Sequence, residues 1–144
     1  AHGNPRRELR LPRGDRLRQD DGGDGGVLRL DGGLGESVFD HCLFIANESV
    51  GCDSATVGGA LEIASGNAAH AYLFNHCTFA WNLSARSAST PAGLFVATGT
   101  ATIRNCIFAG NIASTYSTVG TDLHVGSAGK AIVSYTSFGG EGRD

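Results

Sequence analysis

The sequence predicts an all-β fold in which short parallel strands stack as the coils of a β-helix, about four coils in all. Three observations predict it. A segment of ten residues occurs three times with like residues in like places, and a shorter fourth copy follows. A short apolar run opened by glycine precedes each copy. The copies recur about every 30 residues, a spacing typical of stacked repeat units rather than of a core assembled once.

The glycine-opened runs form the first half of each repeat. They are four to six residues long, and a turn that contains glycine follows each of them, so they are predicted to be strands rather than helices. Glycine is 22 of the 144 residues, and long amphipathic helix patterns are absent from the sequence. The predicted strands lie within residues 25–30, 58–63, 92–96 and 120–125.

The second half of each repeat carries a cysteine, a phenylalanine and an asparagine. A sandwich of antiparallel strands would not need such repetition. In a parallel solenoid, each coil lies about 4.8 Å above the last, so like residues stack on like. The fourth copy has Thr136 at the cysteine position and no asparagine. The predicted ladders are Phe44, Phe79, Phe108 and Phe138; Cys42, Cys77 and Cys106; and Asn47, Asn82 and Asn111.

A bend is predicted inside this second half. The period of two places Cys42 and Phe44 on an inward face and Leu43 on an outward face. The position that Phe39 occupies holds an apolar residue in every repeat, but this position has the wrong parity for the inward face. A corner at the polar pair Asp40-His41 would bring both halves of the segment inside. The equivalent corners are Asn75-His76, Arg104-Asn105 and Ser134-Tyr135.

Two motifs alternate along the chain and suggest a family. Phe-x-x-Asn occurs at 44–47, 79–82 and 108–111, and Gly-Gly-Ala-Leu at 58–61, with partial matches at 25–28 and 92–94. This pattern resembles the repeats of chlamydial polymorphic outer membrane proteins. It is also similar to the right-handed parallel β-helix repeats of large secreted bacterial proteins. The resemblance implies a right-handed parallel β-helix over residues 25–138, with location in a secreted or cell-surface protein.

Composition narrows the possible partners. From residue 25 onward, five Lys and Arg stand against nine Asp and Glu, which disfavours nucleic acid and anionic membranes. No apolar run approaches membrane-spanning length. Residues 1–24 mix arginines with acids and show no strand alternation, so they are predicted to be a linker or disordered leader. Residues 25–144 are predicted to be a segment of a longer solenoid.

Metal and cofactor sites are not expected from the sequence. Three cysteines spaced one per coil form a line, whereas zinc needs convergent ligands, so a buried thiol column is predicted. An inter-coil disulfide stays open, as does the state of Cys52. His41 and His76 should stack at one corner, but the sequence offers no evident third ligand. Asp20–Gly26 resembles a calcium-binding turn, but it occurs only once.

Catalysis is the main alternative. Parallel β-helix enzymes such as pectate lyases and polygalacturonases need clustered carboxylates. The outward acids here, Asp40, Glu62 and Asp122, are scattered. On the next coil, the position equivalent to Glu62 is Val96 or Ala97, and neither is an acid. The predicted function is therefore a non-catalytic, adhesin-like structural segment that meets a host surface or polysaccharide. The alternative is a carbohydrate-binding or pectate-lyase-like β-helix.

The ends of the predicted solenoid lack recognisable caps. Both terminal strands would expose unpaired backbone groups, which favours end-to-end self-association. Asn47 and Asn82 also begin glycosylation sequons, but the repeat itself explains both asparagines, and side-chain hydrogen bonding at a turn is the preferred interpretation.

Overall fold

The computed structural model describes residues 8–10, 16–19, 28–31, 35–49, 59–64, 69–84, 91–113 and 122–139. Every regular element in this part of the chain is a β-strand, and no helix occurs there, which confirms the all-β expectation. The strands are β1 (Glu8–Arg10), β2 (Arg16–Gln19), β3 (Leu28–Asp31), β4 (Glu36–Asp40), β5 (Leu43–Ile45), β6 (Glu48–Ser49), β7 (Leu61–Ile63), β8 (Ala71–Asn75), β9 (Thr78–Ala80), β10 (Leu83–Ser84), β11 (Leu94–Arg104), β12 (Ile107–Ala109), β13 (Ile112–Ala113), β14 (Leu123–Ser134) and β15 (Ser137–Phe138).

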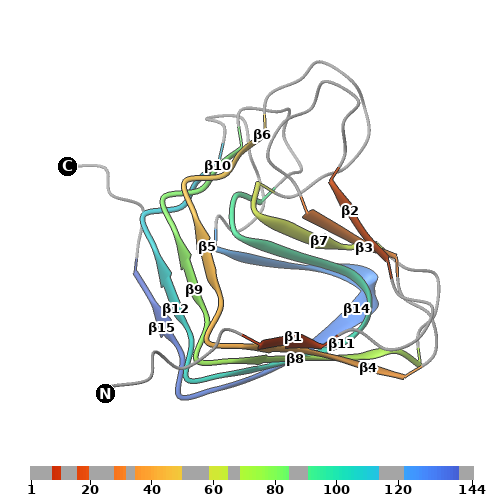
Figure 1. Ribbon diagram of the computed structural model, residues 1–144. Helices are drawn as coiled ribbons and strands as arrows, with labels where there is room; N and C mark the ends of the chain where they lie inside the picture. Colours follow the sequence, from red (N-terminus) through yellow and green to blue (C-terminus); the bar gives the residue numbers. More distant parts are fainter. Residues whose placement is uncertain are drawn as a thin grey trace.

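The strands form three sheets. The largest has the order β1-β4-β8-β11-β7-β3-β2, with β14 also paired to β11. A second sheet has the order β15-β12-β9-β5, and a third has the order β13-β10-β6. The long strand β11 pairs with β7 at its start and with β8 at its end, so the largest sheet turns through a bend and forms two sides of the molecule. Figure 1 shows these two sides facing the side made by β5, β9, β12 and β15.

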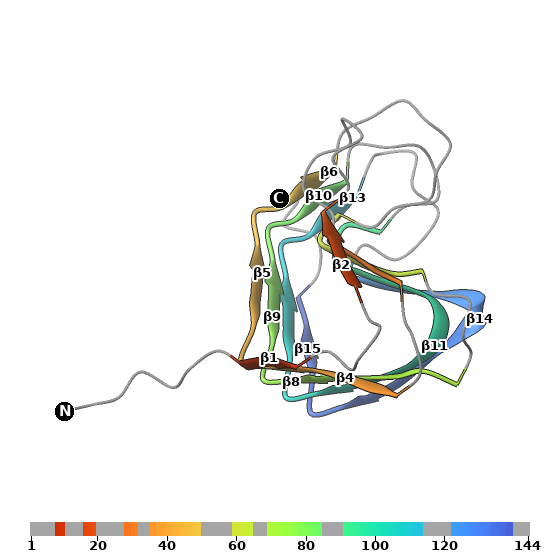
Figure 2. The ribbon, with the colours of Figure 1, turned by 45° about the vertical axis from the view of Figure 1, so that its right-hand side comes forward.

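Adjacent repeats are aligned residue on residue by parallel pairing. Phe44 of β5 pairs with Phe79 of β9, which pairs with Phe108 of β12, which pairs with Phe138 of β15. The glycine-opened strands are aligned in the same way, because Leu28, Leu61, Leu94 and Leu123 pair in turn. Figure 2 shows β5, β9, β12 and β15 side by side in repeat order. The parallel strands and their predicted register are therefore confirmed.

In each repeat, a sharp corner divides the segment that carries the phenylalanine of the ladder. The corner lies at the polar pair of residues where the sequence predicts a bend. The second residue of each pair has a left-handed backbone, with φ of 54° at His41, 52° at His76, 52° at Asn105 and 49° at Tyr135. A second corner follows the phenylalanine strands, with φ of 54° at Ala46 and Trp81 and 61° at Gly110. One left-handed residue turns the chain at each corner, which lets both neighbouring strands point apolar side chains inward.

The core runs between the sheets and consists of side chains from successive repeats. Phe39 and Phe74 stack with ring centroids 4.8 Å apart, and Phe74 meets Phe79 edge to face across the corner at 5.9 Å. Ile103 continues the column of Phe39 and Phe74 and is fully buried. Leucines from the glycine-opened strands close the other side of the core, with Leu61 and Leu94 both fully buried. Aromatic stacking thus adds to the hydrophobic burial that stabilises the stack.

Glycine is required where adjacent repeats approach most closely. A Cβ atom on Gly59 would lie 2.5 Å from the carbonyl oxygen of Ala92 in the next repeat. A Cβ atom on Gly93 would lie 2.1 Å from the carbonyl oxygen of Asp122, again one repeat further on. Both distances are too short for any side chain, so glycine at these places allows adjacent repeats to pack directly on each other.

Two strands form where the sequence predicts a leader without strands. Strand β1 pairs antiparallel with β4, so that Leu9 lies opposite Phe39. Strand β2 pairs antiparallel with β3, so that Leu17 lies opposite Leu30. These two short strands therefore lie within the segment that the sequence predicts to be a linker or disordered leader. That prediction was based on dense charge, but short strands can pair with an exposed sheet edge through their backbones alone.

The last repeat is more exposed than the sequence predicts. Val133 continues the buried column of Phe39, Phe74 and Ile103, yet it is 41% exposed, and Phe138 is 46% exposed. Within the described residues, β14 pairs only with β11 and β15 pairs only with β12. Because no further described strand lies beyond them, side chains on these two strands lack one neighbouring layer. The expected burial of Phe138 is therefore wrong.

Candidate functional site

The phenylalanine ladder is a packing element. Ring centroids are 4.5 Å apart for Phe44 and Phe79, 4.7 Å for Phe79 and Phe108, and 5.0 Å for Phe108 and Phe138. Successive rings are nearly parallel, with interplanar angles of 8°, 2° and 16°. Phe79 and Phe108 are fully buried, whereas Phe44 at the other end is only half-buried. The rings contact each other and leave no face of the two central phenylalanines for a ligand.

The asparagines form a hydrogen-bonded ladder at the start of the third sheet. The Asn47 side-chain amide donates to Asn82 Oδ1 at 2.8 Å, and the Asn82 amide donates to Asn111 Oδ1 at 2.8 Å. Asn82 and Asn111 also donate to the carbonyl oxygens of Phe44 and Phe79. A glycan on Asn82 would have to replace these contacts, and this side chain is fully buried.

Asp122 ends the ladder, a role that the sequence does not reveal. Its Oδ1 accepts a hydrogen bond of 2.8 Å from the Asn111 amide, at the place where a fourth asparagine is missing. The sequence assigned Asp122 to the start of a strand and gave no reason to connect it with the asparagine column. The sequence does show that the fourth repeat has no asparagine, so the Asn111 amide needs another acceptor. An acidic residue in that repeat, Asp122, was the signal that could have revealed the bond.

The three repeated cysteines form a column of thiol side chains. Cys77 and Cys106 are buried and Cys42 is half-buried. Hydrogen bonding with the Cys106 thiol and burial both raise the pKa of Cys77 above its ordinary value, so this thiol stays protonated. The structure therefore shows no disulfide among these three residues. Cys52, for which pairing was left open, lies outside the described residues, as does the Asp20–Gly26 turn.

The three acids considered for catalysis do not share a surface. Asp40 ends β4 at the first corner, Asp122 bonds to Asn111, and Glu62 is buried in the middle of β7. The register places Glu62 opposite Phe95, so the predicted match to Val96 or Ala97 is wrong by one or two residues. Glu62 is also buried rather than solvent-exposed, since only 3% of it is exposed.

A buried polar group, not anticipated from the sequence, joins two neighbouring repeats. Ser37 Oγ lies 3.0 Å from His70 Nε2, and both residues are fully buried. The His70 ring lies 4.4 Å from the ring of Tyr72, which is also buried. A serine beside a histidine is a pattern found in nucleophilic catalysis, but complete burial keeps any substrate away. Ser37 and His70 thus pair their buried polar atoms with each other within the core.

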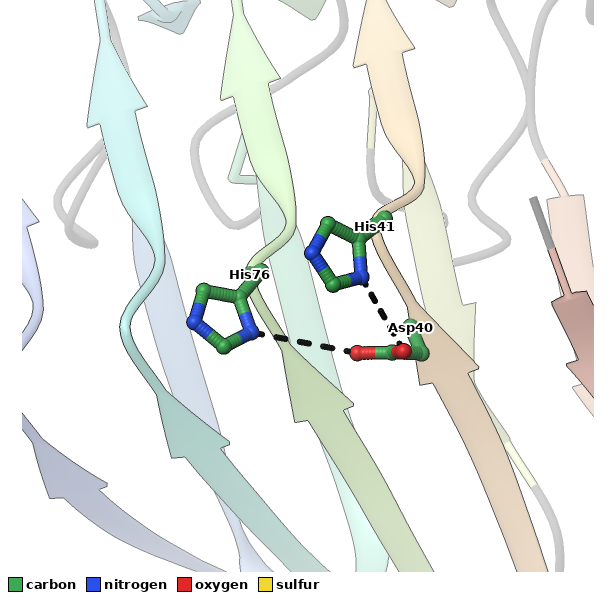
Figure 3. Close-up of side chains that lie close together, drawn as sticks. All are labelled: Asp40, His41 and His76. Atoms are coloured by element: carbon green, nitrogen blue, oxygen red, sulfur yellow. Dashed lines mark ion pairs between the residues drawn. The ribbon is translucent and has the colours of Figure 1, made fainter. Parts of the chain in front are cut away.

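The first corner gathers two histidines and an aspartate at the surface. Asp40 ends β4, His41 follows it at the bend, and His76 occupies the same bend one repeat further on. His41 Nδ1 lies 3.0 Å from Asp40 Oδ2, and His76 Nδ1 lies 3.9 Å from Asp40 Oδ1. The two imidazoles stack with centroids 4.7 Å apart. Figure 3 shows both rings turned so that one nitrogen faces the carboxylate.

Hydrogen bonds orient the Asp40 carboxylate. Asn75, which pairs with Asp40 in the register, donates a hydrogen bond of 2.8 Å from its amide to Oδ1. The hydrogen bond with His41 lowers the pKa of Asp40, and the bond from Asn75 adds to this effect, whereas burial opposes it. The carboxylate is therefore ionised at neutral pH. The side chains of His41 and His76 are 53% and 49% exposed, as expected of corner histidines.

The corner brings together three side chains of metal-ligating types, including a third that the sequence analysis did not identify. One ligand atom each from Asp40, His41 and His76 lies within 4.8 Å of the other two. Asp40 was visible in the sequence directly before His41, but it was interpreted only as part of a polar corner. The alignment of His76 with His41, and hence with the same carboxylate, depends on the register between β4 and β8.

The described residues contain no helix long and apolar enough to span a membrane. No family model, curated protein or solved structure matches this chain.

Proposed function

We propose that this chain is a segment of a right-handed parallel β-helix that serves as a non-catalytic, adhesin-like scaffold in a secreted or cell-surface protein. The observation that carries the proposal is the stacking of like side chains between repeats, from Phe44 to Phe138 and from Asn47 to Asn111. These ladders use the positions that recur in each repeat for packing. The outward positions are then free to vary without disturbing the core.

The outward face of the β5–β9–β12 sheet supports a binding role. Leu43, Ile45 and Ile107 on this sheet are 40–49% exposed, and Trp81 at the adjoining corner is 68% exposed. Exposed apolar side chains that gather on one face are typical of interaction sites, and an exposed indole is suited to stacking on a sugar ring. The ligand class that fits this face is a polysaccharide or a glycosylated host surface.

The alternative function, a carbohydrate-cleaving β-helix, is weaker. Such an enzyme needs two carboxylates facing one scissile bond. Among the described residues, Asp40 ends β4, Glu62 lies buried in β7, and Asp122 precedes β14. This separation of the three carboxylates favours binding over cleavage.

The test combines binding and turnover on one set of polysaccharides. The full chain is applied to a polysaccharide array that includes polygalacturonate, and the same mixtures are analysed for new reducing or unsaturated ends. We expect binding without cleavage, and weaker binding for W81N. Asparagine tolerates the left-handed backbone at this corner, so the variant removes the indole with little strain.

The matched control is Y135N, which removes an exposed aromatic from a left-handed residue at the other corner. Binding by Y135N should equal that of the parent chain. Release of oligosaccharides by the parent chain would favour the enzyme instead, and equal binding by W81N would exclude the proposed face.

A further inference from the structure

The corner of Asp40, His41 and His76 has the donor set of a transition-metal site. Neutral imidazole nitrogen and carboxylate oxygen are ligands that suit zinc and its neighbours in the first transition row. All three donors come from a rigid part of the fold. Asp40 is the last residue of a strand held on both sides, by β1 and β8. The histidines lie at bends that repeat with nearly equal φ.

The distances between the donors are close to those that a metal requires. Bond lengths of about 2.0–2.2 Å place the ligand atoms of a tetrahedral zinc site about 3.4 Å apart. Here His41 Nδ1 lies 3.0 Å from Asp40 Oδ2, and His76 Nδ1 lies 3.9 Å from the other carboxylate oxygen, Oδ1. All three ligand atoms lie within 4.8 Å of one another. Rotation of two half-exposed imidazoles would complete the convergence without moving the backbone.

The neighbouring repeat positions favour a single site of this kind. The register places Asn75 and Arg104 below Asp40, and Asn105 and Tyr135 follow His76 at the corner. These side chains are poor ligands for a transition metal, so the donor set is confined to the first two repeats. Asn75 holds the carboxylate through its amide, and Asn105 donates a hydrogen bond of 3.3 Å to Asn75 Oδ1. Such outer contacts orient metal ligands.

We propose that Asp40, His41 and His76 bind one divalent first-row transition metal ion, with zinc as the reference ion and water at the remaining position. The two histidines bind through Nδ1, the atom that each turns toward Asp40 (Figure 3). The site lies at a surface corner, so the open position is accessible to solvent. This proposal is independent of the scaffold function, because it depends on the local corner alone.

The experiment is a calorimetric titration of the full chain with Zn²⁺ at pH 7.5, with reduced thiols. We expect one equivalent to bind, and D40N, H41N and H76N each to weaken binding about tenfold or more. Asparagine at 41 and 76 reproduces the residue that the third repeat carries at this left-handed position, so the fold is retained. Circular dichroism and thermal melting check each variant.

The matched control is H124N, which removes a histidine that stacks on Phe95 away from the corner. It should bind Zn²⁺ like the parent chain. A parallel titration with Co²⁺ separates nitrogen and oxygen ligands from thiolates, because thiolate coordination adds intense charge-transfer absorption. Absence of Zn²⁺ binding by the parent chain would overturn the proposal, as would thiolate absorption in the parent chain. Binding by H41N and H76N that equals binding by the parent chain would also overturn it, and so would a loss in H124N as large as the loss in these variants.

Discussion

Individual phenylalanines in one column differ in what they contribute. Phe79 and Phe108 each have a stacked ring on both sides and are fully buried. Phe138 has a ring on one side only and is 46% exposed. The sequence repeats the residue type faithfully, but the number of neighbouring layers decides how much apolar area each ring removes from water.

Truncation of the column should therefore depend on position. We expect F79A to lower the free energy of unfolding by about 3–5 kcal/mol, since it opens a cavity between two rings. F138A should cost less than half as much. Chemical denaturation of both variants measures the difference. Equal losses would show that Phe138 is covered in solution by a layer that the described residues do not include.

The Asp40 carboxylate should titrate below its ordinary pKa of 3.8, since the hydrogen bond with His41 favours its ionised form. H41N should raise this pKa toward the ordinary value, and H124N should leave it unchanged. Because the folded-state pKa is the lower one, the stability contribution is present above the ordinary value and is lost as pH falls through the lowered value. Carboxyl carbon shifts followed by NMR give both pKa values, and an unchanged pKa in H41N would contradict the assigned cause.

At the scale of elements, the asparagine ladder joins the short strands β6, β10 and β13. These strands have only two residues each, so their own ladders are short. The side-chain bonds between Asn47, Asn82 and Asn111 add a second, parallel row of hydrogen bonds beside the backbone. The column supplements the pairing that such short strands provide.

The central member of this column should be the most sensitive. N82D replaces an amide that donates to Phe44 O and Asn111 Oδ1 with a carboxylate that cannot donate. We expect a loss of about 1–3 kcal/mol or more, because buried acceptors are left unsatisfied. N47D at the half-buried end should cost less. Thermal melting compares the two, and equal melting temperatures would argue against a cooperative ladder.

At the scale of the whole molecule, the two ends of the stack of repeats differ in how their strands are paired. At one end, β1 and β2 pair with β4 and β3. At the other, β14 and β15 have no further partner among the described strands, and Ile132 and Val133 are 46% and 41% exposed. An uncovered strand edge with exposed apolar side chains favours pairing with another chain.

Self-association should therefore depend on β14. We predict that the parent chain forms oligomers at high concentration and that I132K/V133K shifts it toward monomer, because lysine on an edge strand opposes pairing. Light scattering after size-exclusion chromatography measures the change. The charge control is I107K/A109K on the outward face of β12, a strand that is already paired on both sides. A parent chain that stays monomeric throughout would remove the β14 edge as an association surface.

The repeats themselves could be predicted in detail, while single residues outside the repeat could not. Register, corners and inward columns all follow from repetition, because parallel stacking requires like residues at like heights. The strands at Glu8–Arg10 and Arg16–Gln19 were missed because backbone pairing leaves little trace in a charged segment. The Asp40, His41 and His76 cluster was missed in part because it combines two repeats, and only the register shows that one carboxylate serves both imidazoles.

Residue-on-residue stacking also has a mechanical consequence. Among the described strands, each repeat pairs only with the repeats beside it, so a force applied to the two termini would detach the outermost repeat first and leave the others in place. Each detached repeat would release about 30 residues, or roughly 100 Å of extended chain. A single molecule pulled in this way should lengthen in steps of that size rather than in one event, which would suit a protein that must extend under tension without losing its whole structure at once.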